Sequence, residues 1–525
     1  MCGLIFLSQS NLSKEFAQKS LDTIQHRGPD SILLKEIGNN WLGFSRLSIM
    51  DLSSNGDQPF ENNDRFYLCN GEVYNFRNLK KSLNFNWKSE SDCEVLIPLF
   101  EKGGIKEVVS CIDGEFACVI YDKTQDQVYA ARDAMGIRPL FYGHSSIEDR
   151  ICFASEVKPL LKICDEVKPF PPGFYYSDGE FHCYKDLSRV PFYHDDKLEI
   201  ILRNIKNKLV KGVQKRLDSD AEVGYLLSGG LDSSLVCAIA QQYSSKPIKT
   251  FAIGMSEDAI DLKYAKEVAL HIGSDHTEVI ITRDDVIREI KNVIKTLESW
   301  DITTIRASLG MYLVCKHIGE KTDIKVLMTG EVSDEIFGYK YTDFAPSPEE
   351  FQKEAAKRVR ELYLYDVLRA DRCISAHSLE ARVPFSDTEF VEYVMAINPK
   401  VKMNTYGQGK FLLRKAFEGD LLPDSILYRE KAAFSDAVGH SLVDCIKDYA
   451  ESTYSEVEYR KKVQNFSHGI PFTKESLLFR EIFEEFYPKQ SFLIPDFWMP
   501  NKSWDNCNVL DPSARVLPNY GDSGN

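Results

Sequence analysis

Hydrophobic and polar residues follow one pattern up to about residue 185 and a different one beyond it. In the first part, apolar residues come in short β-type runs, and the runs 116–121 and 127–131 flank a turn-like stretch at 123–126 that predicts a hairpin. The run 66–69 predicts another strand, and the Asn70-Gly71 pair after it predicts a tight turn. We therefore expect mainly β-sheet here, with a few helices.

The second part has the pattern of an α/β protein. A β-type run at 223–227 precedes a glycine-rich loop, an apolar helix is predicted at 235–243, and a second β-run covers 250–253. This alternation is typical of a parallel sheet. Beyond residue 345 we expect mainly helix, and Ser347-Pro348-Glu349-Glu350 predicts a helix start with Ser347 as N-cap. The polar tail after Asp505 is expected to be loose.

Length and charge narrow the picture further. A chain of 525 residues is too long to fold around one hydrophobic core, so more than one domain is expected. The polar stretch 186–198 is the best linker candidate, which predicts domains at 2–185 and 199–525. The hydrophobic fraction of 43% and charged fraction of 27% are typical of a soluble globular protein. A net charge of −15 without a long basic block argues against a nucleic-acid partner. No apolar stretch approaches the roughly 18–20 residues of a membrane span.

Cysteine usage indicates the compartment. The 13 cysteines are scattered and form no C-x-x-C pair, which fits neither a disulfide framework nor a zinc site. A reducing compartment fits better. Because the amino-terminal segment lacks the basic region of a signal peptide, we expect a cytoplasmic protein.

Cys2 is the first candidate for chemistry. Removal of Met1 would expose it, and its own α-amino group, with an ordinary pKa of about 7.7–8.0, could then act as the base for its thiol. Position alone is weak evidence, because a cysteine at position 2 is usually incidental.

The surrounding motifs change that assessment. Through residue 185 the chain resembles the class II glutamine amidotransferases, a family of N-terminal-nucleophile hydrolases. The matching segments are Met1-Cys2-Gly3, His26-Arg27-Gly28-Pro29-Asp30, Arg46-Leu47-Ser48-Ile49-Met50-Asp51, Asn70-Gly71-Glu72-Val73-Tyr74-Asn75, Ser91-Asp92-Cys93-Glu94, Arg132-Asp133 with Gly136-Ile137-Arg138-Pro139-Leu140, and Ala154-Ser155-Glu156. The resemblance implies an α+β domain, an antiparallel β sandwich flanked by helices.

That family hydrolyses the side-chain amide of glutamine. The resemblance implies that Cys2 attacks the amide carbonyl and that the Asn70 side chain and the Gly71 N–H stabilise the oxyanion. Arg46 would hold the glutamine carboxylate, and Asp92 would hold its ammonium. The remaining glutamine contacts carried over from the family are Leu47, Ser48, Ile49, Met50 and Glu72.

A second motif belongs to the α/β part. The string Ser228-Gly229-Gly230-Leu231-Asp232-Ser233-Ser234 follows a predicted strand and opens a helix, where backbone N–H groups can face an anion. It lacks the Gly-Lys-Ser/Thr ending of a Walker A loop. It resembles the PP-loop of ATP pyrophosphatases, which release AMP and pyrophosphate. That resemblance implies Mg²⁺ at Asp232 and Asp334, and ATP beside Leu227, Ser228, Gly229, Gly230, Ser233, Ile253, Thr329 and Gly330.

The full order of motifs resembles the glutamine-hydrolysing asparagine synthetases, close to the bacterial B type. Further matches cover 298–308, 330–335, 380–385, 410–414 and 511–515. The resemblance implies that ATP activates aspartate as β-aspartyl-AMP, which ammonia from glutamine then amidates. Lys410 would stabilise the α-phosphoryl charge, and Glu331 would accept a proton from ammonia or hold the intermediate. Thr303 and Arg306 would contact pyrophosphate or aspartate.

Three positions depart from the family pattern, and other functions stay open. Val332 and Ala437 stand where glycine is common, and the segment 337–340 is one residue shorter than usual. Since valine does not readily adopt a positive φ, the 330–335 loop is expected to differ locally. One alternative is a related amidotransferase that acts on another carboxylate. Another is an impaired homologue that only binds nucleotide. The oligomeric state also stays open, with a homodimer as one candidate.

Overall fold

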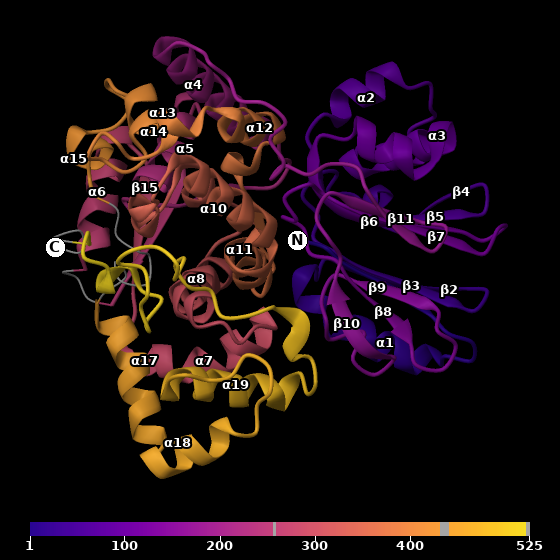
Figure 1. Ribbon diagram of the computed structural model, residues 1–525. Coiled ribbons are helices and arrows are strands. Elements are labelled where there is room, and N and C mark those ends of the chain that lie inside the picture. Colours follow the sequence, from indigo (N-terminus) through magenta and orange to yellow (C-terminus); the bar gives the residue numbers. More distant parts are fainter. Residues whose placement is uncertain (256–258, 431–439, 521–525) are drawn as a thin grey trace.

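Two halves of the protein lie side by side (Figure 1). The computed structural model describes residues 1–255, 259–430 and 440–520. Strands β1–β12 belong to one half, and strands β13–β17 belong to the other together with the helices from α4 onward. Residues 184–197 connect strand β12 (Glu180–Cys183) to helix α4 (Leu198–Lys215), and the domain boundaries predicted around this stretch stay a prediction.

The first half is a sandwich of two antiparallel sheets. One has the order β10-β8-β9-β1-β3-β2, and the other has the order β12-β11-β7-β6-β5-β4. Leu4 and Phe6 from β1 pack with Leu68 from β5 and Val119 from β6, so the inner faces share one core. The bounds are β1 (Gly3–Ser8), β2 (Ser31–Ile37), β3 (Asn40–Arg46), β4 (Phe60–Asn62), β5 (Arg65–Val73), β6 (Gly114–Asp122), β7 (Gln127–Arg132), β8 (Phe141–Ser145), β9 (Ile151–Ala154), β10 (Cys164–Pro169) and β11 (Phe174–Ser177).

Helices cover the outer faces of this sandwich. Helix α1 (Lys14–Asp22) packs on β2 and β3, and helix α3 (Leu96–Cys111) packs on β7 and β11, with α2 (Phe76–Ser82) beside it (Figure 1). The predicted flanked β sandwich is therefore confirmed, as is the β6–β7 hairpin.

The turn predicted at Asn70-Gly71 is wrong. Both residues lie inside β5, where Asn70 pairs with Ala117 and Gly71 pairs with Phe116 of β6. Gly71 has a φ of +155°, and a Cβ there would lie 2.2 Å from the carbonyl oxygen of Glu115. The glycine is therefore needed for close approach between two strands, not for a chain reversal.

The second half contains the predicted parallel sheet, with strand order β15-β14-β13-β16-β17. Strand β13 leads into the glycine-rich loop before helix α5, and β16 leads into residues 329–335. Because neighbouring parallel strands end at one edge, the two loops meet there. The bounds are β13 (Val223–Leu226), β14 (Lys249–Gly254), β15 (Asp275–Ile280), β16 (Val326–Met328), β17 (Glu380–Arg382), α5 (Leu231–Gln242), α6 (Ile260–Ile272), α7 (Arg283–Leu297) and α8 (Ile302–Lys321).

Beyond residue 345 the described chain is mainly helical, as predicted. Helix α10 begins at Pro348, and the Ser347 hydroxyl accepts from the Glu350 N–H at 3.2 Å. The further helices are α9 (Ser333–Phe337), α10 (Pro348–Glu361), α11 (Asp366–Ser375), α12 (Thr388–Ala396), α13 (Pro399–Lys402), α14 (Phe411–Ala416), α15 (Asp424–Leu427), α17 (His440–Thr453), α18 (Glu456–Val463) and α19 (Lys474–Phe486). Ala437 lies outside the described residues.

The described part of the carboxy-terminal segment is not loose, contrary to the prediction. Cys507 and Leu517 are buried in a cluster with Tyr341 and Trp504. A few apolar residues spaced along a polar segment are enough to anchor it, and the low overall hydropathy concealed them.

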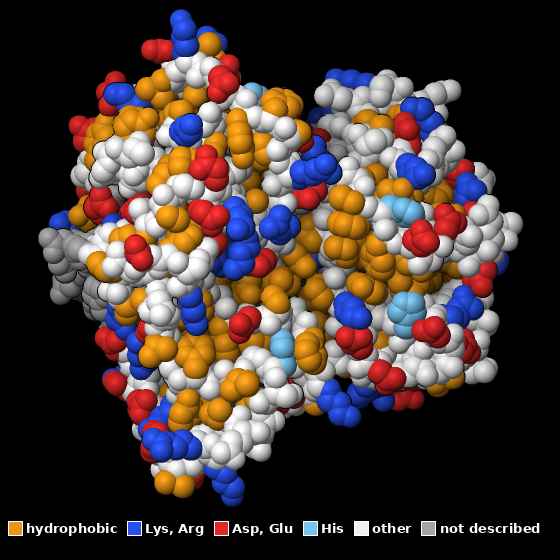
Figure 2. All heavy atoms as spheres, viewed as in Figure 1, with side chains coloured by type: hydrophobic (Ala, Val, Ile, Leu, Met, Phe, Trp, Pro, Cys, Tyr) orange, Lys and Arg blue, Asp and Glu red, His pale blue; other side chains and the backbone are white. Residues whose placement is uncertain are grey.

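Buried charges and apolar side chains both join the two halves. The Arg27 guanidinium lies 2.9 Å from Asp371 of helix α11, and Arg382 of β17 lies 2.8 Å from Glu72 of β5. All four side chains are less than a tenth exposed, so loss of one partner would leave a buried charge uncompensated. Figure 2 shows hydrophobic side chains gathered where the halves meet, with acidic and basic side chains interspersed elsewhere on that face. Among the described residues, no helix has the length and apolar character needed to cross a bilayer.

Candidate active sites

Cys2 directly precedes strand β1, where the start of β1 lies beside the end of β3. The Leu47 N–H points at the Cys2 sulfur from 3.4 Å, and Arg27 donates to the Cys2 carbonyl oxygen at 2.8 Å. Burial raises the pKa of the Cys2 thiol to about 11 while Met1 is attached. The Met1 amino group donates to the Leu379 carbonyl, and burial lowers its pKa to about 5. Removal of Met1 would give Cys2 its own α-amino group, which is the arrangement that an N-terminal nucleophile needs.

Asn70 has the properties of a donor reserved for a ligand. Its side chain is fully buried, and neither amide atom has a hydrogen-bond partner among the described residues. An unsatisfied buried amide costs about 1–3 kcal/mol, so such groups usually serve a purpose. Gly71 is the next residue of strand β5 and carries no side chain.

The predicted glutamine contacts differ in their present partners. Asp92 is buried and accepts from the Val73 N–H at 2.7 Å, and burial raises the pKa of its carboxyl to about 6. Arg46 donates to Asp57 at 2.8 Å and to backbone carbonyls of residues 50–53. The segment that contains Leu47, Ser48, Ile49 and Met50 follows β3, and Glu72 pairs with Arg382 of the other half. The predicted roles of these residues stay predictions.

The second site is a pocket of about 260 Å³ at the carboxyl edge of the parallel sheet. Its lining combines the glycine-rich loop after β13, the loop after β16, and helix α8. It contains most of the residues predicted for ATP and aspartate, namely Leu227, Ser228, Gly230, Asp232, Ser233, Ile253, Thr303, Thr329, Gly330, Glu331, Asp334 and Lys410. Gly229 is outside this lining, because its backbone packs on helix α6, and a Cβ there would lie 2.5 Å from the Ala265 nitrogen.

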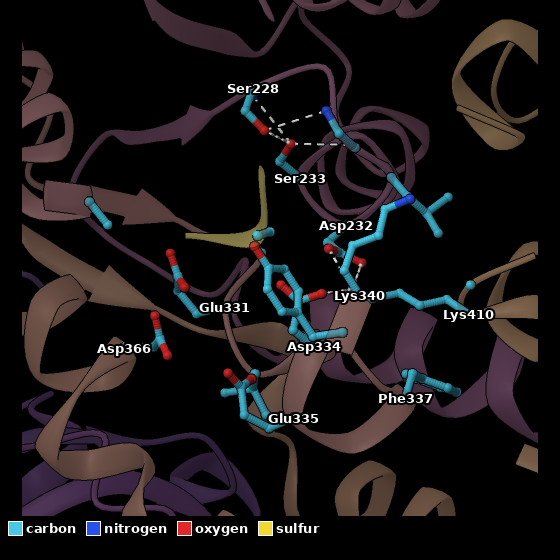
Figure 3. Close-up of a pocket in the computed structure, with 18 of the residues that line it drawn as sticks. Ser228, Asp232, Ser233, Glu331, Asp334, Glu335, Phe337, Lys340, Asp366 and Lys410 are labelled. Carbon is cyan, nitrogen blue, oxygen red and sulfur yellow. Dashed lines mark hydrogen bonds and ion pairs between the residues drawn. The ribbon is translucent and has the colours of Figure 1, made fainter. Parts of the chain in front are cut away.

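Lys410 brings the two predicted metal carboxylates together. Its Nζ lies 2.8 Å from Asp232 and 2.6 Å from Asp334, and it donates to the Ser333 hydroxyl at 3.0 Å (Figure 3). Two carboxylates that converge on one cation fit Mg²⁺, which proteins usually bind through one or two carboxylates together with substrate phosphates. The described residues contain no group of three or more candidate metal ligands, so phosphate oxygens would have to complete the shell.

Glu331 lies in a cluster of charges that the sequence did not reveal. Arg369 contacts Glu331 at 2.6 Å and Asp366 at 3.0 Å, and Glu331 and Asp366 lie across the pocket from Lys410 (Figure 3). Glu335 lies nearby, and burial, with Asp366 and Asp334 close to it, raises the pKa of its carboxyl well above the usual value. The one available signal was the i, i+3 pair of Asp366 and Arg369, which places both on one face of helix α11.

Comparisons with known proteins agree with this geometry. A glutamine amidotransferase domain family matches residues 1–170, and the asparagine synthase family matches residues 204–352 and 342–514. The chain is 39% identical to a probable glutamine-hydrolysing asparagine synthetase of Acanthamoeba polyphaga mimivirus, over 99% of this chain and 100% of that protein. It is 39% and 37% identical to the glutamine-hydrolysing asparagine synthetases of Gallus gallus and Homo sapiens, over 99% of both chains in each comparison. The chain belongs to the glutamine-hydrolysing asparagine synthetase family.

Position 332, where the resemblance to this family predicts a glycine, has a left-handed backbone conformation. Val332 has a φ of +82°, and its side chain is only 1% exposed. The loop therefore keeps a left-handed residue at this position, although we expected valine to avoid it. Packing of the buried side chain beside helix α9 compensates for the strain.

Thr303 and Arg306 were both predicted to contact pyrophosphate or aspartate, and the structure gives the two side chains different surroundings. Thr303 lines the pocket, and its hydroxyl is buried without a partner among the described residues. Arg306, one helical turn later, is not part of the lining and pairs with Glu475 at 2.6 Å and Asp511 at 2.8 Å. Its predicted contact with pyrophosphate or aspartate stays a prediction, and these pairings do not favour it.

Proposed function

We propose that the protein makes asparagine from aspartate, ATP and glutamine, with AMP, pyrophosphate and glutamate as by-products. The observation that carries this proposal is the convergence of Asp232, Asp334 and Lys410 on one point of a pocket lined by the PP-loop. Full-length similarity to glutamine-hydrolysing asparagine synthetases supports the choice of substrates. Residues 2–185 would form the glutaminase domain and residues 199–525 the synthetase domain.

In the glutaminase domain, the Cys2 thiolate would attack the side-chain carbonyl of glutamine. Asn70 and the Gly71 N–H would stabilise the oxyanion, ammonia would leave, and water would cleave the thioester. Asp92 is the ligand for the substrate ammonium. Arg46 would hold the carboxylate by exchanging contacts with the loop at 50–57, since that loop engages four of the five N–H donors of the guanidinium.

In the synthetase domain, a β-carboxylate oxygen of aspartate would attack the α-phosphorus of ATP, and the bond from that phosphorus to pyrophosphate would break. Lys410 would stabilise the charge that builds on the α-phosphoryl group. Ammonia would then attack the acyl carbon of β-aspartyl-AMP, and AMP would leave. Glu331, whose carboxylate Arg369 orients, would accept the proton from ammonia.

The proposal includes Mg²⁺ at Asp232 and Asp334. The metal would neutralise charge on the phosphate oxygens of ATP. Lys410 now holds both carboxylates, and it would turn toward the α-phosphoryl group when nucleotide is bound. Activity in the cytoplasm and a homodimeric assembly are further proposals, which fractionation and sedimentation would test.

Pyrophosphate release tests this function directly. Purified protein would be incubated with ATP, Mg²⁺ and ammonium or glutamine, together with one carboxylic acid at a time. We expect release with aspartate and formation of asparagine. Release only with a different acid would identify an amidotransferase with another substrate. If none of the acids gives pyrophosphate release, the protein is a homologue that only binds nucleotide. Omission of Mg²⁺ should abolish the release.

A further inference from the structure

Arg306 lies at the centre of a buried cluster of charges beside the synthetase pocket. From helix α8 its guanidinium donates to both carboxylate oxygens of Glu475, at 2.8 and 2.6 Å, and to Asp511 at 2.8 Å. The side chains of Arg306 and Glu475 are both 4% exposed. A bidentate pair of this kind fixes the guanidinium plane, so the donors left over point at Asp511.

Asp511 begins a segment that forms part of the pocket wall. We call residues 511–516 the C-terminal strap. Asp511 accepts from the Ser513 N–H at 2.8 Å and also pairs with Lys447 of helix α17. The three residues that follow Asp511 all line the pocket, together with the PP-loop and Thr303. Arg515 pairs with Asp444 at 2.8 Å at the far end of the strap.

We propose that Arg306 is a positioning residue, which holds the C-terminal strap as a wall of the synthetase pocket through Asp511. Arg306 then acts on the substrates through Pro512, Ser513 and Ala514, and it does not touch pyrophosphate or aspartate itself. This inference rests on the proposed synthetase function only for the choice of substrates.

The charges explain why Asp511 is the point of attachment. Arg306 and Lys447 hold the pKa of the Asp511 carboxyl well below its usual range, so this group stays ionised at any pH of interest. Apart from its turn in Ala514–Val516, the strap has no helix or strand. Its position therefore depends on side-chain contacts, and the contact that Arg306 makes is the most deeply buried of its ion pairs among the described residues.

Three variants and one double variant test the proposal. Arg306→Gln, Asp511→Asn and Glu475→Gln each remove one group of the cluster. We expect faster amide hydrogen exchange in peptides that cover 511–516, measured without ligand. We also expect kcat/KM for pyrophosphate release to fall about tenfold for ATP or aspartate, mostly through KM. Arg306→Gln combined with Asp511→Asn should be no worse than the more damaged single variant, because both act through one contact.

Arg480→Gln is the matched control. Arg480 is a buried arginine on helix α19, the helix that also carries Glu475. Its side chain is 3% exposed and pairs with Glu484. Its loss should lower thermal stability but leave strap exchange and both KM values unchanged. The proposal is wrong if Arg306→Gln lowers kcat/KM while Asp511→Asn keeps wild-type exchange and kinetics, because Arg306 would then act on the ligand directly. It is also wrong if strap exchange does not change in Arg306→Gln.

The readouts separate this proposal from the proposed function. If the wild-type protein releases no pyrophosphate with aspartate, the function proposed above fails. Strap exchange, together with ATP binding measured by calorimetric titration, still decides the role of Arg306. Weaker ATP binding in Arg306→Gln and Asp511→Asn, with intact binding in Arg480→Gln, would support it. Equal ATP binding and equal exchange in all variants would overturn it.

Discussion

Val332 holds a backbone conformation that costs a β-branched residue free energy. A left-handed φ costs an L-residue about 1–2 kcal/mol, and Val332 has a φ of +82° at the start of helix α9. Its side chain is buried in the hydrophobic core beside the PP-loop. Burial of a valine side chain contributes about 1.5–3 kcal/mol, which is enough to offset the strain.

Replacement of Val332 by alanine and by glycine separates the two effects. Both substitutions remove the buried side chain, but only glycine also relieves the strain. We expect Val332→Gly to be more stable than Val332→Ala by about 1 kcal/mol, the reverse of the usual helix ranking. Denaturant unfolding would measure the difference. If the alanine variant is the more stable, backbone strain at this position does not contribute to the stability difference.

If Asp92 holds the substrate ammonium as proposed, the use of glutamine should depend on pH. Burial raises the pKa of its carboxyl to about 6, so below that pH it is increasingly neutral and cannot pair with the substrate ammonium. We expect kcat/KM for glutamine hydrolysis to fall about tenfold per pH unit below pH 6, because the pH dependence of kcat/KM follows the ionisation of groups in the free enzyme. Asp92→Asn should be weak at every pH and should lack this acid limb. An unchanged acid limb in that variant would assign the titration to another group.

Motifs identified the residue types of the sites, but not the partners of each side chain. Asp232 and Asp334 were predicted as metal ligands and Lys410 as a contact of the α-phosphoryl group, and the structure places the Lys410 Nζ 2.8 Å from Asp232 and 2.6 Å from Asp334. Arg46 and Arg306 were predicted as ligand contacts, which stay predictions, and in the structure both pair with carboxylates of the protein. Asp57 and Glu475 lie outside every motif, so no local pattern could reveal these pairs.

At the scale of elements, periodicity predicted most of the architecture. The β6–β7 hairpin and the alternation of β13, α5 and β14 follow directly from runs of apolar residues. Asn70-Gly71 misled the prediction because the same dipeptide suits a tight turn and a close contact between strands. Only the partner strand decides between them, and Phe116 is 45 positions away in the sequence.

Helix α13 ends in Lys402, which is buried and has no acidic partner among the described residues. The Lys402 ammonium donates to the Val394 carbonyl in the last turn of helix α12 at 3.2 Å, and its residue is 6% exposed. Burial lowers the pKa of Lys402 to about 7. A positive charge is favourable at the carboxyl end of helix α12, where the helix dipole is negative. The loss of solvation on burial nevertheless has the larger effect on the pKa of Lys402.

Lys402 should therefore make stability depend on pH in alkaline solution. Between about pH 7 and the ordinary lysine pKa of about 10.4, the unfolded chain keeps a proton that the folded chain has lost. Because the unfolded state binds more protons, the free energy of unfolding rises with pH in this window. We expect Lys402→Met to raise the melting temperature at pH 7 and to abolish this rise. Lys400→Met, at an exposed position of the same helix, should keep it.

At the scale of the whole molecule, two sites share one chain but have separate scaffolds. Cys2 belongs to the β sandwich, and the PP-loop belongs to the parallel sheet. The order of motifs predicted this division. The sequence could not predict the interface, because Arg27 and Asp371 are 344 positions apart and neither is recognisable as a partner from its own surroundings.

This division predicts that the loss of Cys2 removes only one of two activities. In Cys2→Ala the backbone carbonyl that accepts from Arg27 stays in place, so the contact of Arg27 with this strand end and with Asp371 survives. We expect glutamine-dependent asparagine synthesis to disappear, while synthesis from added ammonium keeps the wild-type kcat/KM for aspartate and ATP. Cys183→Ala, which changes an exposed cysteine, should affect neither activity. If ammonium-dependent synthesis is lost together with glutamine-dependent synthesis, the synthetase half depends on the Cys2 side chain itself, and the separation of the two sites is wrong.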